Sequence, residues 1–285
     1  MHRVSGLAQM RDWAPALEAA DAVIHLAARV HVMTDSEPDP LAAYRNVNRE
    51  ATLGLAREAA GRGVGRFLFL STIKVNGEQT PGRPFTESDP AAPADPYSAS
   101  KWEAEKGLAE IAAATPFKVI MVRPPLVYGP LVKGNFLKLM RLVEQRVPLP
   151  LRSVRNLRSF IYVGNLVSVL EKLLTAELPR ASTFLVSDDH DLSTPALLRE
   201  IGAAMGVKTT LLPCPPRLLL AAGRLIGRQE EVRRMIESLR ADCSRFKEDL
   251  QWSPPFSPTH GIADTVAWFQ GRSHARRLHN GRIVA

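Results

Sequence analysis

Three short runs of β-branched and other apolar residues constrain the fold of this chain more than any other feature. They are DAVIHLAA (residues 21–28), RFLFLST (66–72) and KVIMVRP (118–124). Each run is nearly continuous in apolar residues, which is typical of parallel strands covered on both faces. The segments between them have helical patterns that stop near Gly61 and Pro116. Strands that alternate with helices predict βαβ units, and therefore an α/β fold with a doubly wound parallel sheet.

The pattern changes after Pro130. Amphipathic helices are predicted over 135–145 and 164–177, a strand over 182–189, and a further helix capped by Ser193 or Thr194. We therefore expect a first domain over residues 1–130 and a smaller lobe that takes up most of 131–270, with some segments returning to the first domain. Residues 271–285 are rich in arginine and are interpreted as a basic tail.

Composition excludes several classes of protein. A chain of 285 residues with 45% hydrophobic content can bury a substantial core. Its longest apolar stretches are interrupted by Pro and Arg and fall short of the ~20 residues that span a bilayer, so no membrane partner is expected. Cys214 and Cys243 cannot form a disulfide framework, and a cytoplasmic location is the expectation. The histidines have no supporting ligand cluster, which predicts no metal site.

The formal net charge of +8 could attract phosphorylated small molecules or nucleic acid. Much of the excess lies in the basic tail, where no aromatic residues alternate with the arginines. We therefore expect no nucleic-acid partner.

The segment PYSASKWEAE (96–105) places Tyr97 four positions before Lys101. On a helix this spacing brings both side chains to one face, where the ammonium can favour the ionised phenol. Such a tyrosine can exchange a proton with a sugar hydroxyl or carbonyl. Four tyrosines and nine lysines predict only about 0.13 such pairs by chance, although a surface tyrosine over a solvated lysine remains the alternative. Ser71 and Thr72 end a predicted strand and add hydroxyls at the functional edge of the sheet.

Six motifs follow one another in a familiar order: DAVIHLAA, RFLFLSTIKVNG, DPYSASKWEAE, VRPPLVYGP, RSFIYVGNL and DLQWSPPFSPTHGIADTVAWF. In this order the chain resembles, over nearly its whole length, the extended short-chain dehydrogenase/reductase family, the NAD-dependent epimerases and dehydratases that act on nucleotide sugars. The resemblance implies a Rossmann-like first domain, a substrate-binding lobe, NAD or NADP as cofactor and a nucleotide-sugar substrate. It also implies a homodimer formed through the helices near 44–60 and 97–114.

The resemblance implies a role for each matching residue. Thr72 would hydrogen-bond the reacting oxygen of the substrate, Tyr97 would be the acid/base, and Lys101 would hold the nicotinamide ribose and tune the tyrosine. The other implied cofactor contacts are Leu26, Ala27, Ala28, Asn48, Ser71, Pro124 and Val127. Asn48 and Thr52 match the family's Asn-x-x-Gly-Thr pattern, in which Ala51 here replaces the glycine.

For the diphosphate of the substrate, the resemblance implies Asn135 and Arg158, and the planar guanidinium suits bidentate binding of phosphate oxygens. Two departures affect the expected substrate contacts. Leu126 stands where epimerases often have asparagine, and Gly164-Asn165 replaces the usual Val-Asp pattern.

The residues after Thr72 bear on the type of reaction. Dehydratases of this family usually have an acidic pair there, whereas this chain has Ile73 and Lys74, which disfavours dehydration. STIKVNGE is more similar to a branch of 4-epimerase-like proteins and reductases of 4-keto-6-deoxy-N-acetylhexosamine nucleotides. The sequence leaves open epimerase or 4-ketoreductase, NAD or NADP, and the identity of the sugar.

A dinucleotide-binding fold of this type is expected to open with G-x-x-G-x-x-G between a strand and a helix. Here the first glycines are Gly6, Gly54 and Gly61, so at least one ~30-residue βαβ unit is expected to be missing. A fragment or misassigned start is the favoured explanation, ahead of a truncated paralogue or a sheet completed by a partner. We expect weak or no NAD binding, which leaves a non-catalytic remnant as the alternative function.

Overall fold

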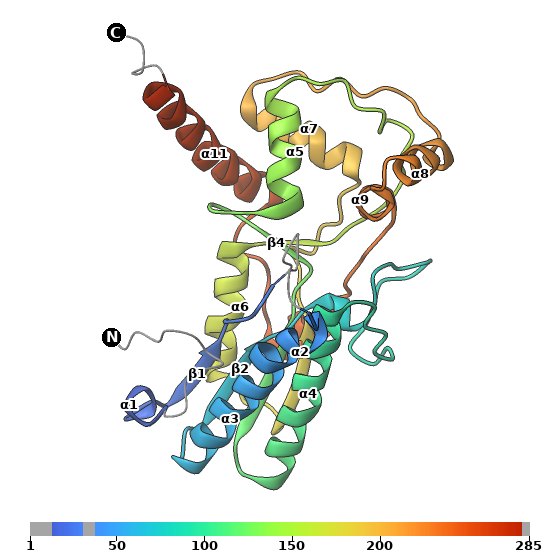
Figure 1. Ribbon diagram of the computed structural model, residues 1–285. Coiled ribbons are helices and arrows are strands. Elements are labelled where there is room, and N and C mark those ends of the chain that lie inside the picture. Colours follow the sequence, from blue (N-terminus) through green and yellow to red (C-terminus); the bar gives the residue numbers. More distant parts are fainter. Residues whose placement is uncertain (1–12, 31–37, 281–285) are drawn as a thin grey trace.

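A four-stranded parallel sheet forms the centre of the first domain (Figure 1). The structure is a computed structural model that describes residues 13–30 and 38–280, with side chains as far as residue 271. The strand order is β1-β2-β3-β6, and neighbouring strands pair in parallel. These strands are β1 (Ala22–His25), β2 (Arg66–Leu70), β3 (Lys118–Arg123) and β6 (Ala181–Leu185). The predicted α/β class with a parallel sheet is confirmed.

Helices cover both faces of β2 and β3. On one face lie α3 (Ala51–Gly61) and α4 (Pro96–Ala114), where Leu53 and Leu108 pack against Phe67 and Phe69. On the other face lie α6 (Val163–Thr175) and α10 (Ser244–Leu250), whose apolar side chains pack against Leu68. Alternate residues of one strand thus enter two different cores, which explains why the RFLFL run is continuously apolar.

The chain enters α3 through α2 (Pro40–Arg45) and one turn of π-helix over Asn46–Glu50. The predicted helices before Gly61 and Pro116 are confirmed, and the first of them contains this π-helical turn. A short helix, α1 (Ala14–Leu17), precedes β1 and buries Leu17 against the same core.

Strand β1 is the exception to the prediction that each apolar run is covered on both faces. Within the described residues it pairs only with β2, so it forms an edge of the sheet. Ile24 is 40% exposed and Leu26 is 55% exposed, whereas the alternating neighbour His25 is buried. The prediction was wrong for one face of β1, because Ile24 is exposed and belongs to none of the core clusters formed by residues 13–30 and 38–280.

The upper lobe in Figure 1 has its own core. Tyr128, Phe136 and Ile201 are among its buried members. The lobe contains the two-stranded parallel sheet of β4 (Leu126–Tyr128) and β5 (Phe160–Tyr162). Its helices are α5 (Gly134–Glu144), α7 (Thr194–Met205), α8 (Pro216–Leu225), α9 (Gln229–Ile236) and α11 (Pro258–Asn280).

Three details refine the second half of the chain. Segments β6 and α6 belong to the main sheet and its covering layer, although both follow Pro130. Ser193 caps α7 by accepting a hydrogen bond from the Ala196 amide, as its sequence predicts. The backbone of α11 stays helical to Asn280 and so continues into the segment interpreted as a basic tail. No helix in the described ranges is long and apolar enough to cross a membrane.

Candidate active site

The carboxyl end of β2 carries the two predicted hydroxyl residues. The Ser71 amide donates to the Val122 carbonyl at 2.7 Å, which extends the pairing with β3 by one residue. Thr72 is extended and caps a turn of 3-10 helix over Ile73–Val75, since its Oγ1 accepts a hydrogen bond from the Lys74 amide at 3.3 Å. The cap fixes the Thr72 side chain at the sheet edge with 9% of its surface exposed.

Helix α4 presents Tyr97 in its first turn. Asp95 is the N-cap: its Oδ1 accepts from the Ser98 amide at 2.7 Å, and the Asp95 amide donates to Ser98 Oγ at 3.2 Å. This reciprocal capping box, followed by Pro96 at the first helical position, defines where the helix begins. The orientation of Tyr97 therefore depends on a cap two residues before it.

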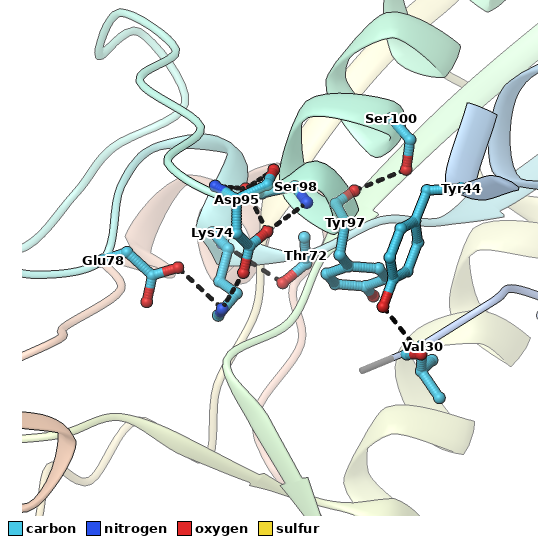
Figure 2. A network of polar contacts seen from close by, with 9 residues as sticks. All are labelled: Val30, Tyr44, Thr72, Lys74, Glu78, Asp95, Tyr97, Ser98 and Ser100. Carbon is cyan, nitrogen blue, oxygen red and sulfur yellow. Dashed lines mark hydrogen bonds and ion pairs between the residues drawn. The ribbon is translucent and has the colours of Figure 1, made fainter. Parts of the chain in front are cut away.

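Lys74 links the turn after β2 to this cap (Figure 2). Its Nζ lies 2.7 Å from Asp95 Oδ2 and 2.7 Å from Glu78 Oε1. Burial opposes ionisation of Asp95, but the hydrogen bonds and charge of Lys74, together with the bonds from Ser98, hold the pKa of Asp95 at about 2. Asp95 is therefore a carboxylate at neutral pH.

Tyr97 is only partly exposed and lies against Tyr44 of α2, with ring centroids 6.3 Å apart in an edge contact. The Tyr44 hydroxyl in turn donates to the Val30 carbonyl at 3.3 Å (Figure 2). Burial, then the charge of Asp95, then Tyr44 raise the pKa of Tyr97 to about 12. The resting form at neutral pH is the phenol, which can donate a proton.

Lys101 lies one turn further along α4 and is 1% exposed. Its Nζ lies 4.1 Å from the centroid of the Phe69 ring, over the end of β2. Burial lowers the pKa of Lys101 to about 7, partly offset by the charge of Glu105. Both residues lie on one helix, as the spacing predicts, and the solvated-lysine alternative is wrong because this lysine is buried. The effect of Lys101 on the ionisation of Tyr97 stays a prediction.

Asn48 ties the loop after β1 to the catalytic helix. It is fully buried; its Oδ1 accepts from the Arg29 amide at 2.8 Å, and its Nδ2 donates to the Arg29 carbonyl and to Ser100 Oγ. Ser100 is on α4, so one carboxamide fixes residues 26–30 relative to Tyr97. Thr52 has a similar structural contact, since its Oγ1 lies 2.9 Å from His25 Nε2. Burial lowers the pKa of His25 to about 4, so this ring is neutral.

Asn135 and Arg158 line a single cavity of about 670 Å³ in the upper lobe, together with Leu126. Burial lowers the pKa of Arg158 to about 10, and the charge of Glu78 raises it in part. The guanidinium thus stays charged at neutral pH. Thr72, Tyr97 and Lys101 do not line this cavity, although Glu78 joins the two regions through its contact with Lys74.

The cavity contains cationic residues that sequence reasoning missed: Lys138, Arg141, Arg228 and Arg234. Lys138 pairs with Glu231, the acidic residue of the lining. The surplus of positive charge suits an anionic ligand with more than one phosphate. Arg228 and Arg234 come from a segment about 70 residues after Arg158, and no motif spacing connects them to it.

Asn165, one of the two departures, has a structural role. It is fully buried, and its Nδ2 donates to Asp188 Oδ1 at 2.7 Å and to the Phe256 carbonyl at 2.9 Å. The Phe256 amide returns a bond to Asn165 Oδ1. Leu126, the other departure, adds apolar surface to the cavity.

The sheet edge has a polar atom suited to a ligand. Ser71 Oγ is buried and has no hydrogen-bond partner within the described residues, and an unsatisfied hydroxyl of this kind is costly unless a ligand or water completes it. Strand β1 is the neighbour of β2 in the sheet. Leu26 and Ala27 directly follow β1, and both are exposed. These residues fit a dinucleotide at the carboxyl edge.

Across the described ranges, no group of three or more His, Cys, Asp or Glu side chains could hold a metal ion.

A parallel sheet with helices on both faces, Thr72 just after β2, and Tyr97 and Lys101 on the neighbouring helix α4 are typical of a Rossmann-like protein of the extended short-chain dehydrogenase/reductase type. Comparison with known families agrees. The model of the NAD dependent epimerase/dehydratase family matches residues 5–186, and the chain belongs to this family.

Among curated proteins, the chain is 42% identical over 260 residues to UDP-glucose 4-epimerase of Vibrio cholerae, which covers 90% of this chain and 79% of that protein. Among solved structures, UDP-glucuronic acid 4-epimerase from Bacillus cereus in complex with NAD is similar at a TM-score of 0.75, with 18% identity over 94% of this chain and 80% of that one.

RMD from Pseudomonas aeruginosa complexed with NADPH is similar at a TM-score of 0.74, with 21% identity over 95% of this chain and 88% of that one. The two structural similarities concern the fold.

Proposed function

We propose that this protein is an NAD(P)-dependent nucleotide-sugar 4-epimerase that acts at C4 of a UDP-sugar. The observation that carries the proposal is the arrangement of Thr72, Tyr97 and Lys101 at the carboxyl edge of β2. The 42% identity to a UDP-glucose 4-epimerase supports the choice of reaction. The arginine-rich cavity supports a substrate that carries a diphosphate.

The proposed roles follow from the contacts of each side chain. Tyr97 exchanges a proton with the C4 oxygen, and Thr72 Oγ1 donates a hydrogen bond to the same oxygen. Arg158 and Asn135 hold the diphosphate in the cavity, which restrains the position of the sugar. Leu26, Ala27, Ala28, Ser71, Lys101, Pro124 and Val127 would hold the dinucleotide, whose nicotinamide supplies hydride acceptance and return at C4. Asn48 would act through the loop that it fixes.

The protonation state of Tyr97 is the central chemical question. The neutral phenol at pH 7 is ready to protonate a C4 carbonyl, whereas removal of a proton from a hydroxyl needs the phenolate. We propose that the ammonium of Lys101, one turn further along the same helix, favours that phenolate. Epimerisation needs both directions, so both residues are required.

The test is conversion of UDP-sugars by the purified protein, extended at its N-terminus with the expected G-x-x-G-x-x-G unit, followed by proton NMR of the C4 epimers with added NAD. We expect epimerisation that is lost in Tyr97→Phe and retained in Tyr162→Phe, a control whose hydroxyl binds Asp264 in the upper lobe. Reduction of a 4-keto sugar nucleotide with NADPH, without epimerisation, would identify the 4-ketoreductase alternative. No turnover and no NAD binding by calorimetry would identify a non-catalytic protein of the same fold and refute the proposal.

The dimer implied by the family resemblance is a separate proposal. Helices α3 and α4 lie next to each other on one face of the sheet, and this pair would form the contact with a second copy (Figure 1). Sedimentation equilibrium measures the mass directly, and a monomer at micromolar concentration would contradict the dimer.

A further inference from the structure

The start of the catalytic helix contains an electrostatic conflict. Asp is among the favoured N-caps and its charge also suits the helix dipole; Asp95 fills that position by accepting a hydrogen bond from the Ser98 amide at 2.7 Å. The acid/base Tyr97 follows two residues later, and a nearby anion opposes ionisation of its phenol. Local sequence alone therefore favours the helix and disfavours the chemistry at the same point.

Lys74 supplies a counter-charge to the Asp95 carboxylate from outside the helix. Its ammonium lies 2.7 Å from the Asp95 carboxylate, and its backbone amide donates to Thr72 Oγ1 in the turn after β2 (Figure 2). One residue thus contacts both the cap of α4 and the hydroxyl of Thr72. Its side chain is only 16% exposed, so the ion pair is weakly screened by water.

Lys74 is needed to balance the negative charges of Asp95 and Glu78. Glu78 pairs with Lys74 at 2.7 Å and also interacts with the charge of Arg158 in the cavity. Two cations, Lys74 and Arg158, therefore face two carboxylates, Asp95 and Glu78. Within the described residues, further charged or titratable groups near Tyr97 include Tyr44 of α2, Arg29 above the Tyr44 ring, and Lys101 of α4.

We propose that Lys74 is a positioning residue for Tyr97: by pairing with Asp95, it allows an anionic helix cap to stand beside a tyrosine that must ionise. The inference rests on the proposed acid/base role of Tyr97. Lys74 moves no proton itself and acts through Asp95. Its position two residues after Thr72 places this cation in the segment where dehydratases of the family usually carry an acidic pair.

The perturbation is Lys74→Met, which keeps the apolar stem and removes the charge. Asp95 then faces Tyr97 without its partner, so the phenol becomes harder to ionise. The acid limb of the pH profile of kcat/KM is expected to move by about 0.5 to 1 pH unit to higher pH. Asp95→Asn, which keeps an oxygen for the cap, should move the limb to lower pH. The double variant should return it towards wild type, which a purely structural role of Lys74 would not produce.

A second readout does not depend on turnover. The protein is labelled with 3-fluorotyrosine, whose phenol is more acidic than that of tyrosine, and the 19F signal that disappears in Tyr97→Phe is followed against pH. The midpoint of that signal should rise in Lys74→Met and fall in Asp95→Asn. Lys74→Arg, which keeps the charge, should restore the wild-type midpoint.

Lys118→Met is the control, because Lys118 is likewise paired with a carboxylate, Glu177 at 2.9 Å, and lies at the start of β3, the end remote from Pro124. In Lys118→Met, the pH midpoint of the Tyr97 19F signal should equal that of the wild-type protein. An unchanged Tyr97 midpoint in Lys74→Met would overturn the inference, as would a double variant displaced as far as Lys74→Met alone. Absence of turnover in every variant, with the midpoints shifted as described, would refute the proposed function and leave the electrostatic inference standing.

Discussion

Lys101 should destabilise the folded protein at neutral pH. Its ammonium is 1% exposed and lies over the Phe69 ring, and burial lowers its pKa from 10.5 to about 7. Each pKa unit corresponds to about 1.4 kcal/mol, so the buried charge disfavours the folded state by at most about 5 kcal/mol. Since relaxation of the surroundings reduces such costs, we expect Lys101→Met to raise the free energy of unfolding by about 2 to 4 kcal/mol at pH 7.

The pH dependence gives the sign of the effect. Between pH 7 and 10.5 the unfolded chain keeps this proton while the folded chain has lost it, so wild-type stability rises with pH in this window. The Met variant lacks that rise. Its advantage over wild type should therefore be largest at and below pH 7 and should shrink towards pH 10.

The assay is urea unfolding of wild type and Lys101→Met at pH 6 to 9.5, followed by tryptophan fluorescence. Lys118→Met is the control because its ammonium is partly exposed in an ion pair with Glu177, and we expect a change below about 1 kcal/mol. A Lys101→Met variant that is less stable than wild type, or a stability difference that does not vary with pH, would refute the reasoning.

Three further predictions concern contacts around the same helices. Arg123→Met should lower the free energy of unfolding by about 3 to 5 kcal/mol, because it leaves the buried carboxylate of Glu105 unpaired; the double variant Arg123→Met/Glu105→Leu should recover most of the loss in chemical denaturation. Gly107→Ala should destabilise the fold by about 1 to 3 kcal/mol, since the added Cβ would lie 2.7 Å from the buried Leu53 side chain. Gly54→Ala on α3 meets no atom within 4 Å and should stabilise the fold by about 0.5 to 1 kcal/mol. Equal melting temperatures of the two variants would contradict this contrast. Asn48→Ala should cost about 2 to 4 kcal/mol and increase amide hydrogen exchange at Arg29, and unchanged exchange there would show that the carboxamide does not hold the loop.

The central strands could be predicted because one local property determined them. RFLFL and KVIMV enter cores on both faces of the sheet, so their continuous apolar pattern and their parallel pairing have one cause. The same pattern in β1 led to a wrong expectation for Ile24. Apolar composition reports what a strand can bury, whereas its actual burial depends on which other segments pack against it.

The helix that carries the proposed catalytic pair could be predicted for a similar reason. Tyr97 and Lys101 lie on one helix, where spacing in the sequence is spacing in space. The capping box of Asp95 and Ser98 is also local, and the pattern D-P-x-S was a signal that could have located it. By contrast, Lys74 meets Asp95 across 21 positions, and that contact depends on how the turn after β2 folds back. The cavity residues Arg228 and Arg234 depend in the same way on where the segment around α9 lies relative to α5, to which Glu231 is linked through Lys138.

The local rules of α4 also explain where the site contains unfavourably placed charges. Each local element follows its own rule: an anion caps α4, and a lysine one turn after the tyrosine shares its helix face. These choices together place a carboxylate beside a phenol that must ionise and a cation where water cannot solvate it. Lys74, from the turn after β2, places a counter-charge at the cap, whereas Glu105, which partly offsets the burial of Lys101, lies on α4 itself. Substitution of the balancing residues should therefore change the ionisation of the site more than its geometry, which is why pH titration is the more discriminating measurement.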